Sequence, residues 1–221
     1  MFLNWKLSAI LSLFALLIGV SAAAEPAPER EWRFRALLDG KPMGEHRFSL
    51  SDLPAGRLLK SSADFKVKFL FLTAYSYVHT ASERWNGDCL VEFRSETVEN
   101  SDRTEVSGNL EQGRFVVRSA IGVTPLDHCS MTFAYWNPKI LSQTRLLHQQ
   151  TGEWLSVEVA PIGKETRLIR GKAVETEHYR ITAAETAIDL WYLPAGVDGE
   201  MEWVGLKSST PEGYVVTYDL I

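Results

Sequence analysis

The sequence lacks the short motifs that mark the common enzyme families. It contains no G-x-S-x-G, H-E-x-x-H, G-x-G-x-x-G, G-x-x-x-x-G-K or C-x-x-C pattern. The usual signs of a triad hydrolase, a zinc protease, a nucleotide site or a redox pair are therefore missing. Catalytic groups can still assemble from distant positions. The absences favour a binding role, and we expect no catalytic residue, no metal and no cofactor.

Runs of like charge are also absent. The chain has 23 Lys and Arg against 28 Asp and Glu, a formal net charge of −5, and these residues are scattered along it. Such a distribution is typical of an ordinary solvated exterior. A mildly acidic protein does not attract nucleic acid or anionic lipid over a distance. The sequence therefore predicts no nucleic-acid partner.

The one long apolar run lies at the start of the sequence. Lys6 precedes an almost uninterrupted apolar stretch from Leu7 to Val20, and three alanines follow, ending at Ala24. The run is short for a membrane span, and the alanines offer a cleavage site, so residues 1–24 are predicted to be a secretory signal peptide. We expect a periplasmic mature chain, cleaved near Ala24, with a single domain over residues 25–221 and no integral membrane segment.

Cysteine is scarce, with only Cys89 and Cys129. Two thiols in one exported domain pair more often than they stay free. A metal site using Asp127 and His128 beside Cys129 would need further ligands at a recognisable spacing, and no other histidine supplies one. The sequence predicts a Cys89–Cys129 disulfide, with two free thiols as the alternative.

Most of the sequence after Glu31 alternates between apolar and polar residues. Trp32, Phe34 and Ala36 share one side of the first run, and turn residues follow from Asp39. Similar runs recur with turn signals every 8–12 residues, a spacing typical of sandwiches and barrels. We expect an all-β fold: a strongly curved antiparallel meander of about twelve strands, shaped as a half-barrel or a barrel.

One stretch departs from this alternation. Asn137 and Pro138 are suited to the cap and first residue of a helix. Apolar and small residues then recur at helical spacing, and Gly152 could end the helix. The members of this predicted helical face are Ile140, Leu141, Thr144, Leu147 and His148. We expect one short helix between two β halves, the alternative being a loop with a helical turn.

A polar and aromatic row is the strongest candidate for a ligand site. Its members, all odd-numbered, are Tyr75, Tyr77, His79, Glu83 and Trp85. On a continuous strand they share one face, which is too polar for ordinary core and too aromatic for an ordinary solvated surface. The row would form a cavity wall in which His79 and Glu83 bind a ligand head group. Alternatively, the two polar side chains satisfy each other or a neighbouring strand, or a bulge changes the register.

Trp136 is a further candidate, within the aromatic segment Phe133–Pro138. This segment could form a lid over the ligand, placed there by the disulfide, or pack against the start of the helix. His46, alone among apolar neighbours, is interpreted as a structural histidine. The three aromatic segments near the end of the chain are expected to close the sheet without chemistry of their own.

These segments also resemble a proteobacterial family of exported proteins of unknown function. The resemblance rests on Asp39–Phe48, Tyr75-x-Tyr77-x-His79, Glu83-x-Trp85, Tyr135–Pro138 and the terminal Trp-Tyr, Trp-Val-Gly-Leu and Gly-Tyr-x-x-x-Tyr segments. More loosely, the strand order is similar to another exported family without assigned function. Its expected architecture is a curled sheet like that of periplasmic lipoprotein carriers, which hold acyl chains on an apolar concave face. The resemblance implies an all-β periplasmic fold and, by analogy of fold alone, a lipid-type ligand.

We therefore expect a non-catalytic periplasmic protein that binds or carries a hydrophobic or amphiphilic, lipid-like molecule. One alternative is a periplasmic hydrolase or isomerase with His79 and Glu83 as its acid–base pair. Another is an envelope module that binds other proteins. An enclosed apolar cavity would favour the carrier, and a hydroxyl or thiol within reach of His79 would favour the enzyme. A filled core with a large exposed apolar patch would favour the module.

Overall fold

The structure, a computed structural model, is all-β. It describes residues 30–69, 72–184, 186–194, 200–210 and 213–221. The predicted signal peptide lies outside these residues. The described chain forms fourteen antiparallel strands and one 3-10 turn, which confirms the predicted fold class. The structure shows no helix, within the described ranges, that is long and apolar enough to cross a membrane.

Most strands are joined by short turns. Their bounds are β1 (Arg30–Leu38), β2 (Lys41–Leu53), β3 (Gly56–Phe69), β4 (Leu72–Asn86), β5 (Cys89–Glu99), β6 (Asp102–Glu111), β7 (Arg114–Ser119), β8 (Gly122–Leu126), β9 (Arg145–Leu147), β10 (Trp154–Ile169), β11 (Lys172–Ala183), β12 (Thr186–Leu193), β13 (Glu202–Ser209) and β14 (Val215–Leu220). The 3-10 turn η1 (Pro138–Ser142) lies between β8 and β9.

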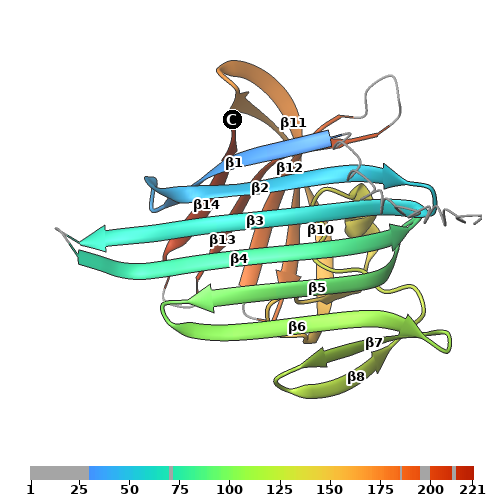
Figure 1. Ribbon diagram of the computed structural model, residues 1–221. Coiled ribbons are helices and arrows are strands. Elements are labelled where there is room, and N and C mark those ends of the chain that lie inside the picture. The colour runs from blue at the N-terminus through green and yellow to red at the C-terminus, as the bar shows by residue number, and fades with distance from the viewer. Residues whose placement is uncertain (1–29, 70–71, 185, 195–199, 211–212) are drawn as a thin grey trace, which may run out of the picture.

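The fourteen strands form one sheet, in the order β8-β7-β6-β5-β4-β3-β2-β1-β14-β13-β12-β11-β10-β9. Every pair joins strands that are consecutive in the sequence, except that β1 pairs with β14, from Phe34 opposite Leu220 to Leu38 opposite Val216. The first and last strands therefore meet within the sheet, and β8 and β9 form its two edges. Figure 1 shows β8 at one of these edges.

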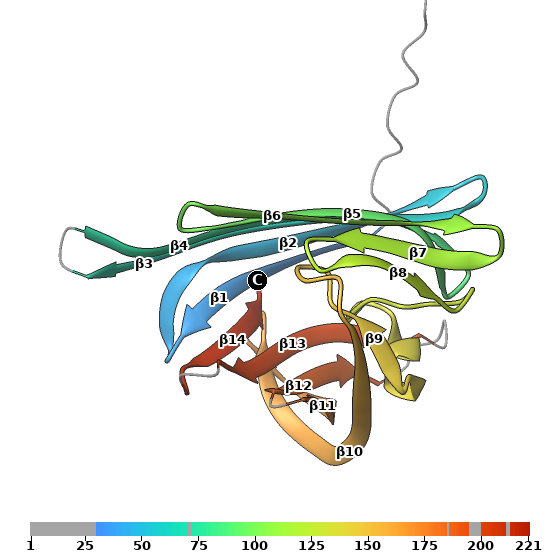
Figure 2. The same ribbon diagram turned by 90° about the horizontal axis from the view of Figure 1, so that it is seen from below.

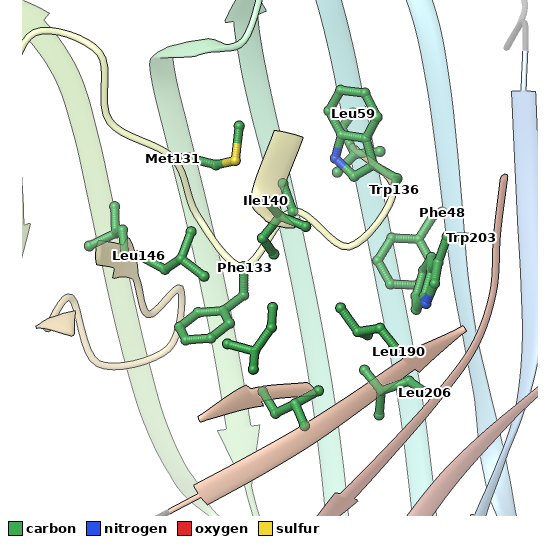
Figure 3. Close-up of a cluster of buried hydrophobic side chains, with 14 of the residues drawn as sticks. Phe48, Leu59, Met131, Phe133, Trp136, Ile140, Leu146, Leu190, Trp203 and Leu206 are labelled. Atoms are coloured by element: carbon green, nitrogen blue, oxygen red, sulfur yellow. The ribbon is translucent and has the colours of Figure 1, made fainter. Parts of the chain in front are cut away.

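The sheet curls so that its two halves face each other. β1 to β8 form one layer, and β9 to β14 turn beneath it (Figure 2). Residues 127–153, here called the inserted segment, connect β8 to β10 and contribute Met131 and Phe133 to the core. These side chains lie on the same side of the β1–β8 layer as Leu190 and Leu206 (Figure 3). The chain's own apolar side chains fill this part of the space between the layers.

The first hairpin shows why the alternating pattern produces this sheet. Trp32, Phe34 and Ala36 are buried, and Trp32 pairs with Phe48 across the hairpin. In the turn between β1 and β2, Asp39 has a φ of 48° and Gly40 has a φ of 75°. Tight hairpin turns require positive φ values of this kind. The predicted first hairpin is therefore confirmed.

The predicted helix is shorter than the pattern indicated. Asn137 does cap it, because its side chain accepts a hydrogen bond from the backbone N–H of Lys139. The turn is 3-10 and ends at Ser142. The backbone N–H of Leu147 instead donates to Met131 at 2.9 Å, and β9 pairs with β10. Strand pairing on both sides of this stretch therefore replaces the later helical turns.

The predicted disulfide is present between Cys89 and Cys129, with Cα atoms 4.6 Å apart. It joins the first residue of β5 to the inserted segment just after β8. Beside it, the backbone N–H of Leu90 donates to the carbonyl of Ser130 at 3.0 Å. The start of the inserted segment is therefore fastened to the β1–β8 layer by a covalent bond and a hydrogen bond.

Candidate functional site

The predicted polar and aromatic row occupies the core face of β4. Tyr77, His79, Glu83 and Trp85 are buried, and Tyr75 is half-buried. Ten residue steps separate the two ends of the row, about 33 Å on an extended strand. That length exceeds what one small ligand contacts, and the row falls into two clusters with different neighbours.

The first cluster surrounds the carboxylate of Glu83, which is 0% exposed. Its Oε2 atom accepts a hydrogen bond from the indole Nε1 of Trp85 at 3.0 Å. Its Oε1 atom accepts one from the hydroxyl of Thr132 at 2.8 Å and one from the side-chain amide of Gln149. Thr132 and Gln149 belong to the inserted segment, so this carboxylate ties that segment to β4.

Burial raises the pKa of Glu83 to about 6, and the hydrogen bonds from Thr132, Gln149 and Trp85 oppose the rise. At neutral pH the charged form is stabilised by these three protein donors. The three donors occupy both carboxylate oxygens, so the carboxylate positions its neighbours. Glu83 is therefore a positioning residue in this structure.

Trp136 lies beside Trp85, at the Glu83 end of the row. The two rings meet edge to face with centroids 5.6 Å apart, and the guanidinium of Arg57 lies 4.8 Å from the Trp136 ring centroid. Trp136 is 3% exposed, and its buried Nε1 has no hydrogen-bond partner among the described residues. The structure thus places Trp136 with Trp85 and Glu83, away from Tyr75 and Tyr77.

The second cluster gathers aromatic rings from β2, β4, β14 and the inserted segment. Its members, here called the tyrosine–histidine cluster, are His46, Tyr77, His79, Tyr135 and Tyr218. The Nδ1 atom of His46 lies 3.0 Å from the hydroxyl of Tyr218, and the rings of His46 and His79 are 6.5 Å apart. The hydroxyl of Tyr77 is hydrogen-bonded to the side-chain amide of Gln150.

Apolar rings border this cluster. Phe48 stacks on His46 with ring centroids 4.0 Å apart, and Phe65 stacks on Tyr77 at 5.3 Å. Trp203 contacts Phe48 edge to face at 5.1 Å. Polar atoms therefore lie directly beside aromatic surface, the combination that small-molecule sites use to fix orientation and bury apolar groups.

The tyrosine–histidine cluster is uncharged at neutral pH. Burial lowers the pKa of His46 to about 3, with His79 adding to the shift, and lowers that of His79 to about 4, with His148 adding to it. Burial also raises the pKa of Tyr218, and the nearby Tyr77 and Tyr135 hydroxyls contribute. The cluster therefore offers hydrogen bonds without charge.

One atom of this cluster stands out. The Nε2 atom of His46 is buried and has no hydrogen-bond partner among the described residues. Its Nδ1 atom is already engaged with Tyr218. An unpaired buried polar atom costs about 1–3 kcal/mol. A ligand that offered a hydrogen bond here would remove that penalty.

His79 and Glu83 do not form a pair. They are four residues apart on β4, about 13 Å, and each bonds to other groups. The Nδ1 atom of His79 lies 2.9 Å from the Oγ1 hydroxyl of Thr97 on β5. No group of three His, Cys, Asp or Glu side chains in the described part of the chain is arranged to hold a metal ion.

Sequence analysis missed the partners of the row. His46 was interpreted as structural, yet it lies two residues from the buried Phe48 on the same strand, which places both on the core face. Tyr218 was assigned only to closing the sheet. The alternation within β2 could have identified His46, whereas the pairing of β14 with β1 that brings in Tyr218 has no local signal.

The fold resembles that of a solved protein. The crystal structure of a beta-barrel-like protein of DUF1849, a domain of unknown function, from Brucella abortus is similar with a TM-score of 0.61 and 11% sequence identity. The match covers 86% of this chain and 94% of that one. At this identity the likeness concerns the fold alone.

Two further comparisons concern the sequence. None of the curated proteins matches the chain. Residues 34–221 match the family described as a domain of unknown function, DUF6134. This match spans all the described strands except the first residues of β1, and includes both clusters on β4. The chain therefore belongs to the DUF6134 family.

Proposed function

We propose that the mature chain is a periplasmic protein that binds or carries a hydrophobic or amphiphilic, lipid-like molecule without transforming it. The observation that carries this proposal is the buried, unpartnered Nε2 atom of His46 beside the stacked ring of Phe48. A hydrogen-bonding head group would satisfy the imidazole, and an apolar body would contact the adjacent rings.

The charge state of the tyrosine–histidine cluster limits the kinds of ligand head group that it can bind. Because the pKa values of His46 and His79 are lowered to about 3 and about 4, neither ring offers a positive charge to an anionic head group at neutral pH. Neutral imidazoles exchange hydrogen bonds with hydroxyls and amides. We therefore propose an uncharged, hydroxyl-bearing head group, such as that of a monoacylglycerol.

Calorimetric titration tests this with two probes of the same chain length, monoolein and oleate, at neutral pH. We expect monoolein to bind more tightly. Replacing His46→Leu should weaken monoolein binding about tenfold, a loss typical of a buried hydrogen bond, while the protein stays folded at the temperature of the titration. The exposed His128→Leu serves as control and should leave binding unchanged. Absence of monoolein binding, or equal loss in the control, would contradict the proposal.

The hydrogen bond between His79 and Thr97 supports a second candidate, a hydrolase in which His79 activates the Thr97 hydroxyl. A pKa of about 4 makes His79 a weak base at neutral pH. Hydrolysis of p-nitrophenyl butyrate that disappears in Thr97→Val, while the fold is retained, would establish the enzyme and displace the carrier. Activity equal to that of buffer would leave the carrier as the better proposal.

A further inference from the structure

Strand pairing places three residues of the core face in one row. His46 on β2 lies opposite Ala63 on β3, and Ala63 lies opposite His79 on β4. Residues directly opposite each other in an antiparallel sheet project from the same face, and Ala63 is buried. In this row a single methyl group therefore stands between the two imidazoles of the tyrosine–histidine cluster.

The spacing of these two imidazoles suits one shared oxygen atom. Their ring centroids are 6.5 Å apart. A hydrogen bond from a ring nitrogen to an oxygen spans about 2.9 Å. One oxygen bonded to a nitrogen of each ring, with the usual bent arrangement, would therefore hold the centroids about 6–7 Å apart. The observed separation falls within that range.

Each imidazole is already bonded to a protein hydroxyl through its Nδ1 atom. Nδ1 of His46 lies 3.0 Å from the hydroxyl of Tyr218, and Nδ1 of His79 lies 2.9 Å from that of Thr97. This leaves Nε2 as the remaining polar atom of each ring, and Nε2 of His46 is buried without a partner among the described residues. An oxygen shared by the two rings completes a chain of hydrogen bonds from Tyr218 to Thr97.

The chemistry of two neutral imidazoles restricts the group that can be shared. A neutral imidazole has one donor nitrogen and one acceptor nitrogen. When one ring presents its N–H and the other its bare nitrogen, the shared group must accept one hydrogen bond and donate the next. A hydroxyl does both, whereas an ether or carbonyl oxygen only accepts. Hydrogen bonds arranged in a chain also strengthen one another, which favours the hydroxyl further.

We propose that one hydroxyl of the bound molecule lies between His46 and His79, next to Ala63, and bridges the two imidazoles. This assignment rests on the proposed carrier function and narrows its ligands to long-chain alcohols, including monoacylglycerols, at the expense of the corresponding ethers. Ala63 sets this specificity, because a larger side chain would fill the position of the hydroxyl. Since Nε2 of His46 is closed to solvent, the hydroxyl enters as neighbouring side chains move apart.

The test compares 1-decanol with decyl methyl ether by calorimetric titration of the mature protein, with monoolein measured alongside. The two probes share one alkyl chain, and only the alcohol can donate a hydrogen bond. We expect the alcohol to bind about tenfold more tightly than the ether, a difference typical of one buried hydrogen bond. Equal affinities for the two probes, with monoolein still bound, would overturn the bridge and leave the carrier function standing. Absence of binding by monoolein and decanol alike would overturn both.

The two histidines are then replaced singly and together. In His46→Leu and in His79→Leu the preference for the alcohol should largely disappear, because only one imidazole remains beside the oxygen. The double variant should lose no more of the preference than either single one, since residues that hold the same group have non-additive effects. His178→Leu is the control. His178 is half-buried on β11, with its Nε2 atom 3.0 Å from Asp189 on β12, and its replacement should keep the preference.

Ala63→Ser tests the position without removing an imidazole. The new hydroxyl lies in the row between the two rings and takes the place of the ligand's hydroxyl, so the preference for decanol over the ether should be lost. Because this hydroxyl finds partners, the melting temperature should fall less than in Ala183→Ser, which buries a hydroxyl opposite Val157 and Thr186. A preference for the alcohol that survives in Ala63→Ser, or in both single histidine variants, would overturn the bridge.

Discussion

Glu83 connects two parts of the chain that are far apart in sequence. Its carboxylate receives hydrogen bonds from Thr132 and Gln149 of the inserted segment and from Trp85 on its own strand. The same segment is also held by Ser95, whose hydroxyl donates to the backbone carbonyl of Gln149. The position of the inserted segment between the layers thus depends on a small number of buried polar contacts.

Replacing Glu83→Ala should lower the free energy of unfolding by about 3–5 kcal/mol, because it leaves two buried donors and one half-buried donor without an acceptor. Glu92→Ala is the control: Glu92 is half-exposed, and its nearest cations are 3.7 Å away, so its loss should cost less than about 1 kcal/mol. Urea denaturation measures both. Similar losses in the two variants would contradict the assigned role of Glu83.

His79 should make stability depend on pH. Its pKa is lowered from 6.5 to about 4 in the folded protein, so between these values the unfolded chain binds a proton that the folded chain does not. The free energy of unfolding therefore falls as the pH drops from 6.5 to 4, by about 3 kcal/mol from this group. Glutamine does not titrate, so the free energy of unfolding of the His79→Gln variant should fall less over the same pH range.

Urea denaturation at pH 7 and pH 4 gives this difference directly. Glu83 acts in the opposite direction, because its raised pKa of about 6 lets the folded protein take up a proton first as the pH falls. Glu83 is present in both the wild type and the His79→Gln variant, so its contribution cancels when the two are compared. An equal pH dependence of the wild type and His79→Gln would show that His79 is not buried as the structure has it.

The residues of β4 illustrate what a sequence reveals about individual side chains. Period-two alternation places Tyr77, His79 and Glu83 on one face, and they do share it. Which groups satisfy them could not be predicted: Glu83 bonds to Thr132 and Gln149, whose positions depend on the path of an irregular segment. No local pattern encodes that path.

Among the elements, the start of β3 is tightly constrained. Gly56 has a φ of 105°, and a Cβ atom built there would lie 1.9 Å from the backbone oxygen of Trp85. β3 and β4 therefore approach too closely at this point for any side chain. The hairpin between β2 and β3 requires glycine for both conformation and space.

Gly56→Ala should destabilise the protein by about 2–4 kcal/mol, since it combines strain with a backbone clash. Gly113→Ala provides the control. Gly113 also has a positive φ, 81°, but no atom lies within 4 Å of its added Cβ, so only the conformational strain of about 1–2 kcal/mol applies. Thermal denaturation compares the two. A loss at Gly113 as large as that at Gly56 would argue against the close approach.

The elements were predictable where the pattern is local. Alternation and turn residues identify the first hairpin, and Asn137 was recognised as a cap. The extent of the helix was not predictable, because Leu146 and Leu147 are completely buried whether they lie on a helical face or in a short strand. The short strand forms in place of the helix because β9 pairs with β10 and because the backbone N–H of Leu147 donates to the carbonyl of Met131.

For the whole molecule, we expect a single unfolding transition. The described strands form one sheet, and side chains from both layers share one core cluster. Neither half can bury its core face without the other, so the two should lose structure together. Urea unfolding followed by tryptophan fluorescence and by far-ultraviolet circular dichroism should give coincident curves. Two separate transitions would show that the halves are independent units.

The sequence predicted a curved antiparallel meander but not how the sheet is completed. Pairs between consecutive strands follow from short turns. The pairing of β1 with β14 joins residues almost the whole described chain apart, such as Phe34 and Leu220. Nothing in either strand alone specifies that partner, since many strands share the same alternation.

That pairing has a consequence for the order of folding. Each hairpin can form once its own two strands are available, but β1 has no partner on one side until β14 arrives. In a chain delivered from its amino end, the backbone N–H and C=O groups along that side of β1 stay open to other strands until the last. Unpaired strand edges recruit foreign chains, so the interval before β14 docks is when this protein most needs a chaperone.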